Sequence, residues 1–386
     1  MPEKIKLCAL TTISKTMDWF IVDSMRNLAQ NGYEITLVSN MEPGFAERNR
    51  DYATCLHLPM SRGAGVADLF TKPFFLWKYF RQHRFDVIYY TSPNVSLYAS
   101  LAGWLAGVKF RVYSQCGLRY VAFQGIKRVI FKWVEKLTCM FSTHVRGQSP
   151  LNRQFAIDEG LCSAEKISVV GIGGTIGVNL CQCDAIDIPT EKKSRRCQYG
   201  VAESAFVYGY VGRINADKGI NELIKAFLQV HAQHKNTHLV LVGMLDDANP
   251  ITEENLKTAQ THPAITLTGN VPPAEVYNHM AMFDVLTHPT YREGFGKVLQ
   301  EAMGMHLPII TTNVPGPSEV IENGISGVLV EIKAPQDLAN KMEILYKDAD
   351  MRNNLARNAR ERAVKFFDRP IMLQNILDDL NIIIAN

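Results

Sequence analysis

The chain has 386 residues, of which 47% are hydrophobic and 20% charged, and its net charge is +3. These values are typical of a soluble globular protein that is long enough for two domains with sizeable cores. No apolar run is long enough to predict a membrane span, and the N-terminus lacks the apolar segment of a signal peptide.

The predicted elements of the first half alternate between short apolar strands and helices, which is typical of a parallel α/β domain. We expect helices at residues 20–31, 74–83, 97–106 and 126–140. Strands are expected at residues 5–10, 34–39, 87–90, 110–114, 144–146 and 167–170.

A change in composition follows these elements. Residues 176–203 lack a regular hydrophobic period and contain Pro189 and a charged run at 191–196. We interpret this stretch as a linker and mobile loop between two domains. The first domain would then cover residues 1–175 and the second 204–368.

The alternation then restarts. We predict helices at residues 221–231, 275–282 and 298–305, and strands at 206–211, 238–242, 265–268, 283–288, 309–312 and 327–330. A long helical tail begins at Pro335 and is broken near 368–370. Its last part, 369–386, is expected to pack back toward the first domain. Two such units joined by one linker predict a cleft between them, where ligands of parallel sheets bind.

Charge is distributed unevenly along the chain. Residues 1–170 hold 21 Lys and Arg against 13 Asp and Glu, whereas the remainder holds 20 against 25. Between residues 106 and 146 there are eight basic residues and one acid, Glu135. A basic first domain favours an anionic partner, such as a membrane surface or a phosphate-bearing acceptor. Solvated helix faces are the alternative, and nucleic acid is disfavoured because no binding motif accompanies the charge.

Eight cysteines are scattered along the chain, and only Cys181, Cys183 and Cys197 lie close together. Their spacing fits no common zinc pattern, so we predict free thiols in a reducing cytoplasm and no metal site.

Residues 291–301 read Tyr-Arg-Glu-Gly-Phe-Gly-Lys-Val-Leu-Gln-Glu and carry most of the chemical information. A predicted strand, a glycine turn and a helix start follow one another, and this arrangement binds phosphate through exposed backbone N–H groups. Glu293 and Glu301 flank the turn. Because carboxylates repel phosphate, their expected partners are the neutral hydroxyls of a ribose and a sugar. The pattern therefore predicts a nucleotide-sugar site.

A second loop adds two cations. Gly212 ends a predicted strand, and Arg213 and Lys218 follow it at the carboxyl edge of the sheet, where they would suit a diphosphate. In glycosyl transfer the departing nucleoside diphosphate gains negative charge, which preplaced cations stabilise. Ordinary surface charges are the alternative, and the downstream glutamate pair weighs against it.

Taken together, Val211-Gly212-Arg213, Lys218-Gly219, His288-Pro289, the Glu293 and Glu301 pair and Ser318-Glu319 resemble the retaining glycosyltransferases of family 4. The resemblance covers residues 205–365 in consistent order and the first half only loosely. It implies the GT-B architecture, an α/β fold of two Rossmann-like domains that face each other across a cleft.

The resemblance also implies roles. Arg213, Lys218 and Glu293 would be catalytic, with the two cations on the donor diphosphate and Glu293 on the sugar hydroxyls. Glu301 would bind the ribose, and the stretch 269–271, which includes Val271, would contact the base. The backbone N–H groups near the phosphate or sugar would be those of Phe295, Gly296 and Lys297, and Gly212 completes the set of donor-binding residues. Similar enzymes need no Asp-x-Asp metal site, so Asp246 and Asp247 are expected to be surface residues, and no cofactor is expected beyond the donor substrate.

The first half departs from the family pattern. Many relatives carry a His-Gly pair near the sugar, whereas the corresponding place here is Cys116-Gly117. A neutral thiol cannot replace an imidazole as donor or base, so the usual first-domain contact is in doubt. Gln115 and Arg119 are candidates for replacing it.

Residues 125–134 combine Lys127, Arg128 and Lys132 with Phe131 and Trp133. We expect either an amphipathic helix that lies on anionic lipid or a core-facing apolar stripe with solvated lysines.

We expect a metal-independent retaining enzyme that moves a hexose or N-acetylhexosamine from a nucleotide sugar, UDP rather than GDP. The acceptor would be a saccharide, lipid-linked, in cell-surface polysaccharide assembly, and the protein would be cytoplasmic or peripheral on the inner membrane face. A soluble acceptor and a non-catalytic nucleotide-sugar-binding subunit are the rival hypotheses. A nicotinamide oxidoreductase is disfavoured because neither half carries the glycine fingerprint.

Overall fold

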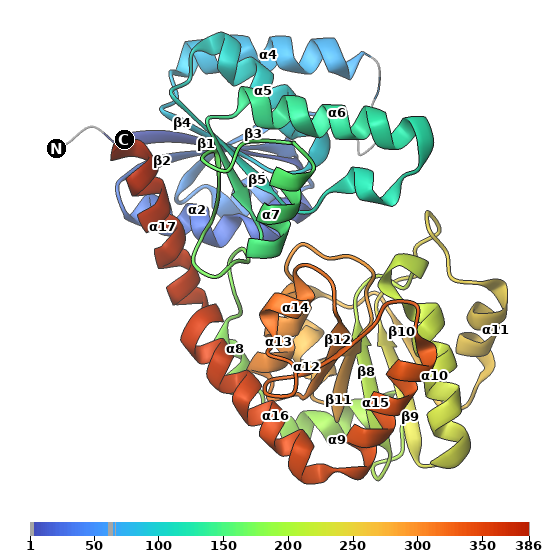
Figure 1. Ribbon diagram of the computed structural model, residues 1–386. Coiled ribbons are helices and arrows are strands. Elements are labelled where there is room, and N and C mark those ends of the chain that lie inside the picture. The colour runs from blue at the N-terminus through green and yellow to red at the C-terminus, as the bar shows by residue number, and fades with distance from the viewer. Residues whose placement is uncertain (1–3, 61–64, 66, 386) are drawn as a thin grey trace. The chain divides into compact units, whose positions relative to one another are not determined.

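The computed structural model describes residues 4–60, 65 and 67–385. It divides into two compact units, residues 1–176 with 370–386, and residues 177–369 (Figure 1). The chain therefore passes between the units twice, at 176–177 and at 369–370.

The first unit contains a seven-stranded parallel sheet with strand order β3-β2-β1-β4-β5-β6-β7. The strands are β1 (Ile5–Ile13), β2 (Tyr33–Asn40), β3 (Ala53–His57), β4 (Val87–Tyr90), β5 (Phe110–Gln115), β6 (His144–Gly147) and β7 (Ile167–Val169). The helices are α1 (Ser14–Phe20), α2 (Val22–Gln30), α3 (Phe45–Asn49), α4 (Asp68–His83), α5 (Pro93–Ala106), α6 (Gly125–Phe141) and α7 (Pro150–Asp158), with a 3₁₀ turn, η1, at Arg119–Ala122.

Helices cover both faces of this sheet, so its strands are buried on each side. Successive residues of β1 enter different cores: Cys8 packs with α4, α5 and α6 on one face, and Ala9 packs with α1 and α2 on the other. This two-residue period explains why the strands are apolar throughout instead of alternating.

The C-terminal helix α17 (Arg369–Ala385) belongs to the first unit for nearly all of its length. Leu377 and Leu380 pack in the same core as α1 and α2. The Tyr33 hydroxyl donates to Asn381 at 2.8 Å, and Asp379 forms an ion pair with the buried Arg146 of β6. The last helix thus completes one face of the first sheet.

The second unit contains a six-stranded parallel sheet with strand order β10-β9-β8-β11-β12-β13. The strands are β8 (Phe206–Val211), β9 (Thr237–Val242), β10 (Ile265–Gly269), β11 (Val285–His288), β12 (Ile309–Thr312) and β13 (Val328–Val330). The helices are α8 (Leu180–Asp184), α9 (Ile188–Gln198), α10 (Ile220–Gln233), α11 (Glu253–Thr261), α12 (Val276–Met280), α13 (Lys297–Gly304), α14 (Pro317–Val320), α15 (Pro335–Lys347) and α16 (Ala349–Arg362). Short 3₁₀ turns, η2 and η3, lie at Ala216–Lys218 and Pro273–Glu275, and a π-helical turn, η4, at Ala363–Phe367.

The predicted linker and mobile loop at 176–203 is wrong for most of its length, because α8 and α9 form there. Asp187 caps α9 by accepting from the Thr190 N–H at 3.3 Å, and Pro189 occupies the first turn, where a missing N–H costs nothing. Arg196 is only 2% exposed and donates to the Met282 carbonyl at 2.7 Å and to Asp284 at 2.8 Å. The charged run is therefore an anchored helix of the second unit.

The helical tail contains one break that the periodicity does not reveal. Asp348 ends α15 and caps α16 by accepting from the Met351 N–H at 2.8 Å. Among the residues that the structure describes, no helix combines the length and apolar character needed to cross a bilayer.

Candidate functional site

The second sheet reverses its strand order between β8 and β11, and the loops that follow these two strands lie at that point. In open parallel sheets, ligands bind at such a switch point, beyond the carboxyl ends of the strands. Gly212, Arg213 and Lys218 follow β8, and Glu293 follows β11. The topology therefore brings together two of the predicted motifs that are separated by some seventy residues in the sequence.

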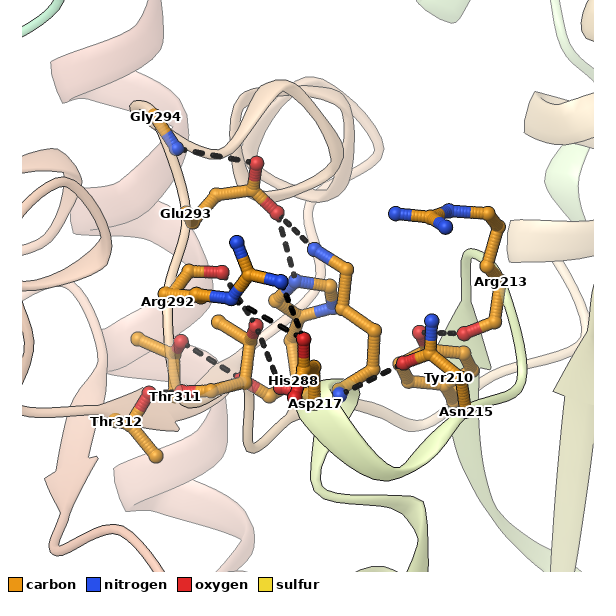
Figure 2. Close-up of polar contacts among 12 residues, drawn as sticks. Tyr210, Arg213, Asn215, Asp217, His288, Arg292, Glu293, Gly294, Thr311 and Thr312 are labelled. Carbon is orange, nitrogen blue, oxygen red and sulfur yellow. Dashed lines mark hydrogen bonds and ion pairs between the residues drawn. The ribbon is translucent and has the colours of Figure 1, made fainter. Parts of the chain in front are cut away.

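Lys218 and Glu293 form an ion pair between their Nζ and Oε2 atoms. His288 Nε2 lies 3.8 Å from the same carboxylate oxygen, and the Gly294 N–H donates to the other oxygen at 3.2 Å (Figure 2). Burial by itself raises the pKa of Glu293, but the Lys218 charge and the contact with His288 outweigh it and hold this pKa well below its usual range. Glu293 is therefore ionised at neutral pH.

His288 of β11 contacts the Glu293 carboxylate from within the buried part of the second unit. Its ring is 2% exposed and stacks on the Tyr210 ring, with centroids 5.5 Å apart and planes 8° apart. Burial lowers the pKa of His288, so the imidazole is neutral at pH 7. The Tyr210 hydroxyl donates to the Arg213 carbonyl at 2.8 Å, which links the ring stack to the loop after β8.

Gly219 allows Lys218 to reach Glu293. A Cβ atom at this position would lie 1.9 Å from the Pro289 carbonyl oxygen, and the residue has φ +70°. Any side chain would therefore push the loop after β8 away from the loop after β11. Asn215 fixes the other end of the turn by accepting from the Lys218 N–H at 3.0 Å.

The loop that carries Glu293 is tied down by residues that the sequence did not single out. Arg292 forms an ion pair with Asp217, and the Tyr291 N–H donates to the Asp217 carbonyl at 2.8 Å. On the other side, the Thr312 hydroxyl of β12 donates to the Thr290 carbonyl. The spacing of single residues gives no signal for such contacts, because each depends on which loops the topology places together.

Glu301 lies on α13 and is 9% exposed. Lys297, one turn earlier, places its Nζ 3.5 Å from the Glu301 carboxylate. Burial raises the pKa of Glu301, and the charges of Lys297 and Arg369 only partly oppose the shift. The two predicted glutamates thus differ. The environment of Glu293 stabilises its ionised form, because Lys218 lies against the carboxylate. The cation nearest to Glu301, Lys297, compensates less well for burial, so the Glu301 oxygens keep their capacity to accept hydrogen bonds from a ligand.

The start of α13 presents backbone donors, as predicted from the glycine turn. Gly296 has φ +92° and precedes the first helical residue. Within the described part of the chain, no acceptor is recorded for the N–H groups of Phe295 and Gly296. The Phe295 side chain is buried and packs edge-on against Phe367 at 5.7 Å, so only its backbone is offered to a ligand.

Arg213 extends from the end of β8 with its side chain 63% exposed, on the opposite side of the cluster from Glu293 (Figure 2). Its Nη1 donates to Asp246 at 2.5 Å, and Asn215 donates to the same carboxylate at 3.0 Å. The hydrogen bond from Asn215, then that from the Ala248 N–H and the charge of Arg213, hold the pKa of Asp246 below its usual range. Asp246 is therefore a partly exposed residue at the surface, and its contact with Arg213 orients a predicted phosphate-binding side chain.

Two further predicted residues lie at the edge of the sheet. Gly212 follows β8, donates its N–H to the Val242 carbonyl at 2.9 Å and lies close to the Tyr210 hydroxyl, so it shapes the strand end. Val271 follows β10 at the same edge of the sheet, but two strands away from β8. Its place is compatible with a ligand that extends along the sheet edge.

In the first unit, Cys116 follows β5, and its sulfur lies 3.6 Å from the Ser114 hydroxyl. Gln115 is 3% exposed and donates to the buried Glu135 at 2.7 Å, so it is not available to replace a histidine at a ligand. The side chain of Arg119 lies outside the described residues. No group of three or more His, Cys, Asp or Glu residues among those described could hold a metal ion.

Comparison with known proteins covers both units. The family described as "Glycosyl transferases group 1" matches residues 191–362, and the "Glycosyl transferase 4-like domain" matches residues 17–173. The chain is 27% identical over 372 residues to the capsular polysaccharide biosynthesis glycosyltransferase CapM of Staphylococcus aureus, covering 96% of this chain and 95% of CapM.

A second relative is the N,N'-diacetylbacillosaminyl-diphospho-undecaprenol alpha-1,3-N-acetylgalactosaminyltransferase of Campylobacter jejuni. It is 25% identical over 320 residues, which cover 81% of each protein. Among solved structures, HepE of Anabaena in complex with UDP and glucose matches with a TM-score of 0.81 at 20% identity, over 98% of this chain and 99% of HepE. With both halves matched and the fold shared over the full length, the protein belongs to the family 4 glycosyltransferases and has the GT-B fold of two Rossmann-like domains.

Proposed function

We propose that the protein transfers a hexose or N-acetylhexosamine from a nucleotide sugar, UDP favoured, to a saccharide acceptor with retention of configuration. The observation that carries this proposal is the meeting of Lys218 and Glu293 at the switch point of the second sheet. Lys218 supplies a cation for the diphosphate, and Glu293 supplies an ionised carboxylate for the sugar hydroxyls. The two groups lie at hydrogen-bonding distance from each other.

The diphosphate would bind between the two cations and the start of α13. Lys218 supplies a point charge, Arg213 a planar fork of donors, and the N–H groups of Phe295 and Gly296 complete the ring of donors. When the bond to the sugar breaks, charge moves onto the leaving diphosphate, and these donors stabilise it more than the intact donor.

The two glutamates would bind opposite ends of the same ligand. Glu293 is ionised and held between Lys218 and His288, so it can accept hydrogen bonds from the sugar hydroxyls. Glu301, on α13, would accept from the ribose hydroxyls. UDP is favoured because HepE, which has the same fold, was solved with UDP.

Retention would follow if the acceptor attacks the face from which the diphosphate leaves, through an oxocarbenium-like state. An oxygen of the departing phosphate would take the proton of the acceptor hydroxyl, so no strong protein base is needed. Burial raises the pKa of the Cys116 thiol in the first unit, so this residue is no base, in keeping with a scheme that places proton transfer on the donor.

The acceptor is proposed to be lipid-linked, in the assembly of a cell-surface polysaccharide at the inner face of the plasma membrane. Support comes from the relatives: CapM acts in capsular polysaccharide biosynthesis, and the Campylobacter jejuni enzyme acts on a diphospho-undecaprenol-linked sugar. A soluble acceptor is the alternative within the same fold.

The test is release of nucleoside diphosphate from a panel of UDP-, GDP-, ADP- and TDP-sugars, with and without saccharide acceptors. We expect slow UDP release from one UDP-sugar, strongly reduced in Glu293→Gln and unchanged in Glu254→Gln, an exposed glutamate of α11. Tight binding without turnover on any donor and with any acceptor would favour the non-catalytic subunit instead. A glycosidic linkage of inverted configuration in the product would contradict the retaining mechanism alone.

A further inference from the structure

Helix α6 turns an apolar stripe away from its own domain. Its large exposed side chains recur at spacings of three, four and seven residues, which places them on one side of the helix. They are Ile126, Val129, Ile130, Trp133 and Met140, with exposures of 72%, 50%, 53%, 58% and 56%.

The side of α6 that faces the domain carries polar as well as apolar groups, including the buried Cys139 and the half-buried Phe131. Glu135 is buried there and accepts hydrogen bonds from Tyr113 at 2.8 Å and from Gln115 at 2.7 Å. Thr138 and Cys139 are buried beside it. The interpretation of this helix as a core-facing apolar stripe with solvated lysines therefore holds only in part: Phe131 packs on the core, whereas Trp133 and its exposed neighbours do not.

The two neighbouring helices extend this surface. Helix α5 packs against both α4 and α6, and all three cover one face of the first sheet (Figure 1). Trp104 of α5 contacts Phe141 of α6, with ring centroids 5.2 Å apart. Of the twenty-two exposed large hydrophobic residues among those described, eleven lie on these three helices. We term these eleven residues the α4–α6 apolar face. Five of them are the α6 residues named above, and the other six are Leu69, Phe70, Phe74, Phe75, Trp104 and Leu105.

So many exposed large hydrophobic side chains on three neighbouring helices are unusual for a protein that functions alone in water. The charges around it indicate what the partner is. Lys127 and Lys136 flank the α6 stripe and are exposed, as are Lys78 and Arg81 of α4. Lys136 lies over the Trp133 ring, with its Nζ 5.6 Å from the centroid.

The acids near this face are already engaged. Asp68 of α4 lies 3.7 Å from Lys72, and Glu135 points into the domain. Glu159 of α7 pairs with Lys132 at 2.7 Å and approaches Arg128 at 3.6 Å. Lysines flanking an apolar stripe that contains tryptophan are the pattern of a helix that lies in the headgroup region of an anionic bilayer.

We propose that the α4–α6 apolar face docks onto a bilayer surface that contains anionic lipid. The aromatic and aliphatic side chains would enter the headgroup boundary, and the flanking cations would meet the phosphates. A second copy of this chain is the rival occupant, and it is less favoured because the cations of the face would then oppose each other. The proposal stands apart from the nucleotide site, which lies in the other unit.

The experiment is co-sedimentation of the full chain with vesicles of phosphatidylcholine alone and of an equal mixture with phosphatidylglycerol. We compare wild type with the double variant Ile130→Glu/Trp133→Glu. The matched control is Ile332→Glu/Ile344→Glu, which changes two residues of the second unit that are 40% and 43% exposed. Stabilisation by UDP, measured in the same preparations, reports whether each variant keeps its donor site and its fold.

We expect wild type and control to bind the mixed vesicles at least about tenfold more tightly than the double variant, with weaker binding in high salt. A second variant, Lys127→Glu/Lys136→Glu, keeps the apolar face and should lose the preference for anionic lipid. Absence of wild-type binding to the mixed vesicles, or equal losses in variant and control, would overturn the proposal. So would a wild-type dimer in sedimentation equilibrium that dissociates in Ile130→Glu/Trp133→Glu without any vesicle binding. A failure of UDP binding with intact vesicle binding would instead count against the proposed function alone.

Discussion

Lys218 and Glu293 form an ion pair that joins the loop after β8 to the loop after β11. The pair is mostly buried, and His288 lies beneath it, 3.8 Å from the shared carboxylate oxygen. In this arrangement a residue for phosphate and a residue for sugar hydroxyls hold each other in place before any ligand arrives. Such preorganisation lowers the cost of ordering the side chains when a donor binds.

Replacing Lys218 by alanine should therefore weaken both the ligand site and the orientation of Glu293. We expect the affinity for UDP to fall by about 10- to 100-fold, because a partly buried charge loses its partner. Lys225→Ala, on the exposed side of α10, is the matched control and should bind UDP as wild type does. Isothermal titration calorimetry measures the difference, and equal affinities in the two variants would remove Lys218 from the site.

Gly219 offers a test of the close approach between the two loops. Gly219→Ala meets the Pro289 carbonyl oxygen, whereas Gly324→Ala, at a similar φ of +75°, meets nothing within 4 Å. Both variants should lose about 1 kcal/mol of stability from the positive φ, and Gly219→Ala should lose more because the two loops must also move apart. Only Gly219→Ala should lose UDP binding as well. Chemical unfolding and calorimetry together separate the two effects, and normal UDP binding by Gly219→Ala would show that the approach of the loops does not matter.

The two glutamates should respond to pH in opposite ways. Burial raises the pKa of Glu301, so the folded state keeps the proton of this group to a higher pH than the unfolded state does. As the pH rises from the unfolded-state pKa to the folded-state pKa, the contribution of Glu301 to the free energy of unfolding therefore falls. Glu301→Gln should thus melt about 2–4 °C above wild type at pH 8, with a smaller gap at pH 5.

Glu293 has a lowered pKa and stabilises the fold once it is ionised, a contribution lost only as pH falls through its folded value. Glu293→Gln should accordingly melt below wild type by a similar margin at both pH 5 and pH 8. Melting curves of the two variants in the absence of nucleotide provide the test. Parallel pH dependence in both would mean that the two carboxyl environments are alike.

Arg196 should be essential for the stability of the second unit. Its guanidinium is buried and bonds to the carbonyls of Met282, Glu203 and Ala205 and to Asp284. Arg196→Ala leaves these acceptors unpaired and should cost about 3–5 kcal/mol. Lys193→Ala, one turn away on the exposed side of α9, should change stability by less than about 0.5 kcal/mol. Urea unfolding compares them, and similar midpoints would show that α9 is not an anchor.

Every strand except β3, and the two-unit organisation, could be predicted from the sequence because apolar runs in parallel sheets are short, buried and regularly spaced. The edge strand β3 was missed because its residues are only partly buried, so it lacks such a run. Helix α9 was missed because its residues are charged and its anchor is a single buried arginine, which periodicity does not detect. The orientation of α6 was left open for a related reason. The sequence shows an amphipathic helix but not which side meets the domain, and it does not show that the charged Glu135 is buried while several apolar residues are exposed.

The candidate site was predicted where spacing within one segment carries the signal, as for Glu293 and Glu301 on either side of a glycine turn. The contacts that hold the site together were not predicted. His288 contacts Glu293, Asp217 pairs with Arg292, and Asp246 pairs with Arg213. These contacts form only because the strand order places the loops together, and a linear pattern does not contain that information.

The most direct test of the account is a calorimetric titration of UDP into the full chain and into Glu301→Ala. The account predicts that wild type binds one UDP and that Glu301→Ala binds it at least about tenfold more weakly, since the ribose hydroxyls lose their carboxylate acceptor. Undiminished binding of UDP by Glu301→Ala, or no binding of any nucleoside diphosphate by wild type, would contradict it.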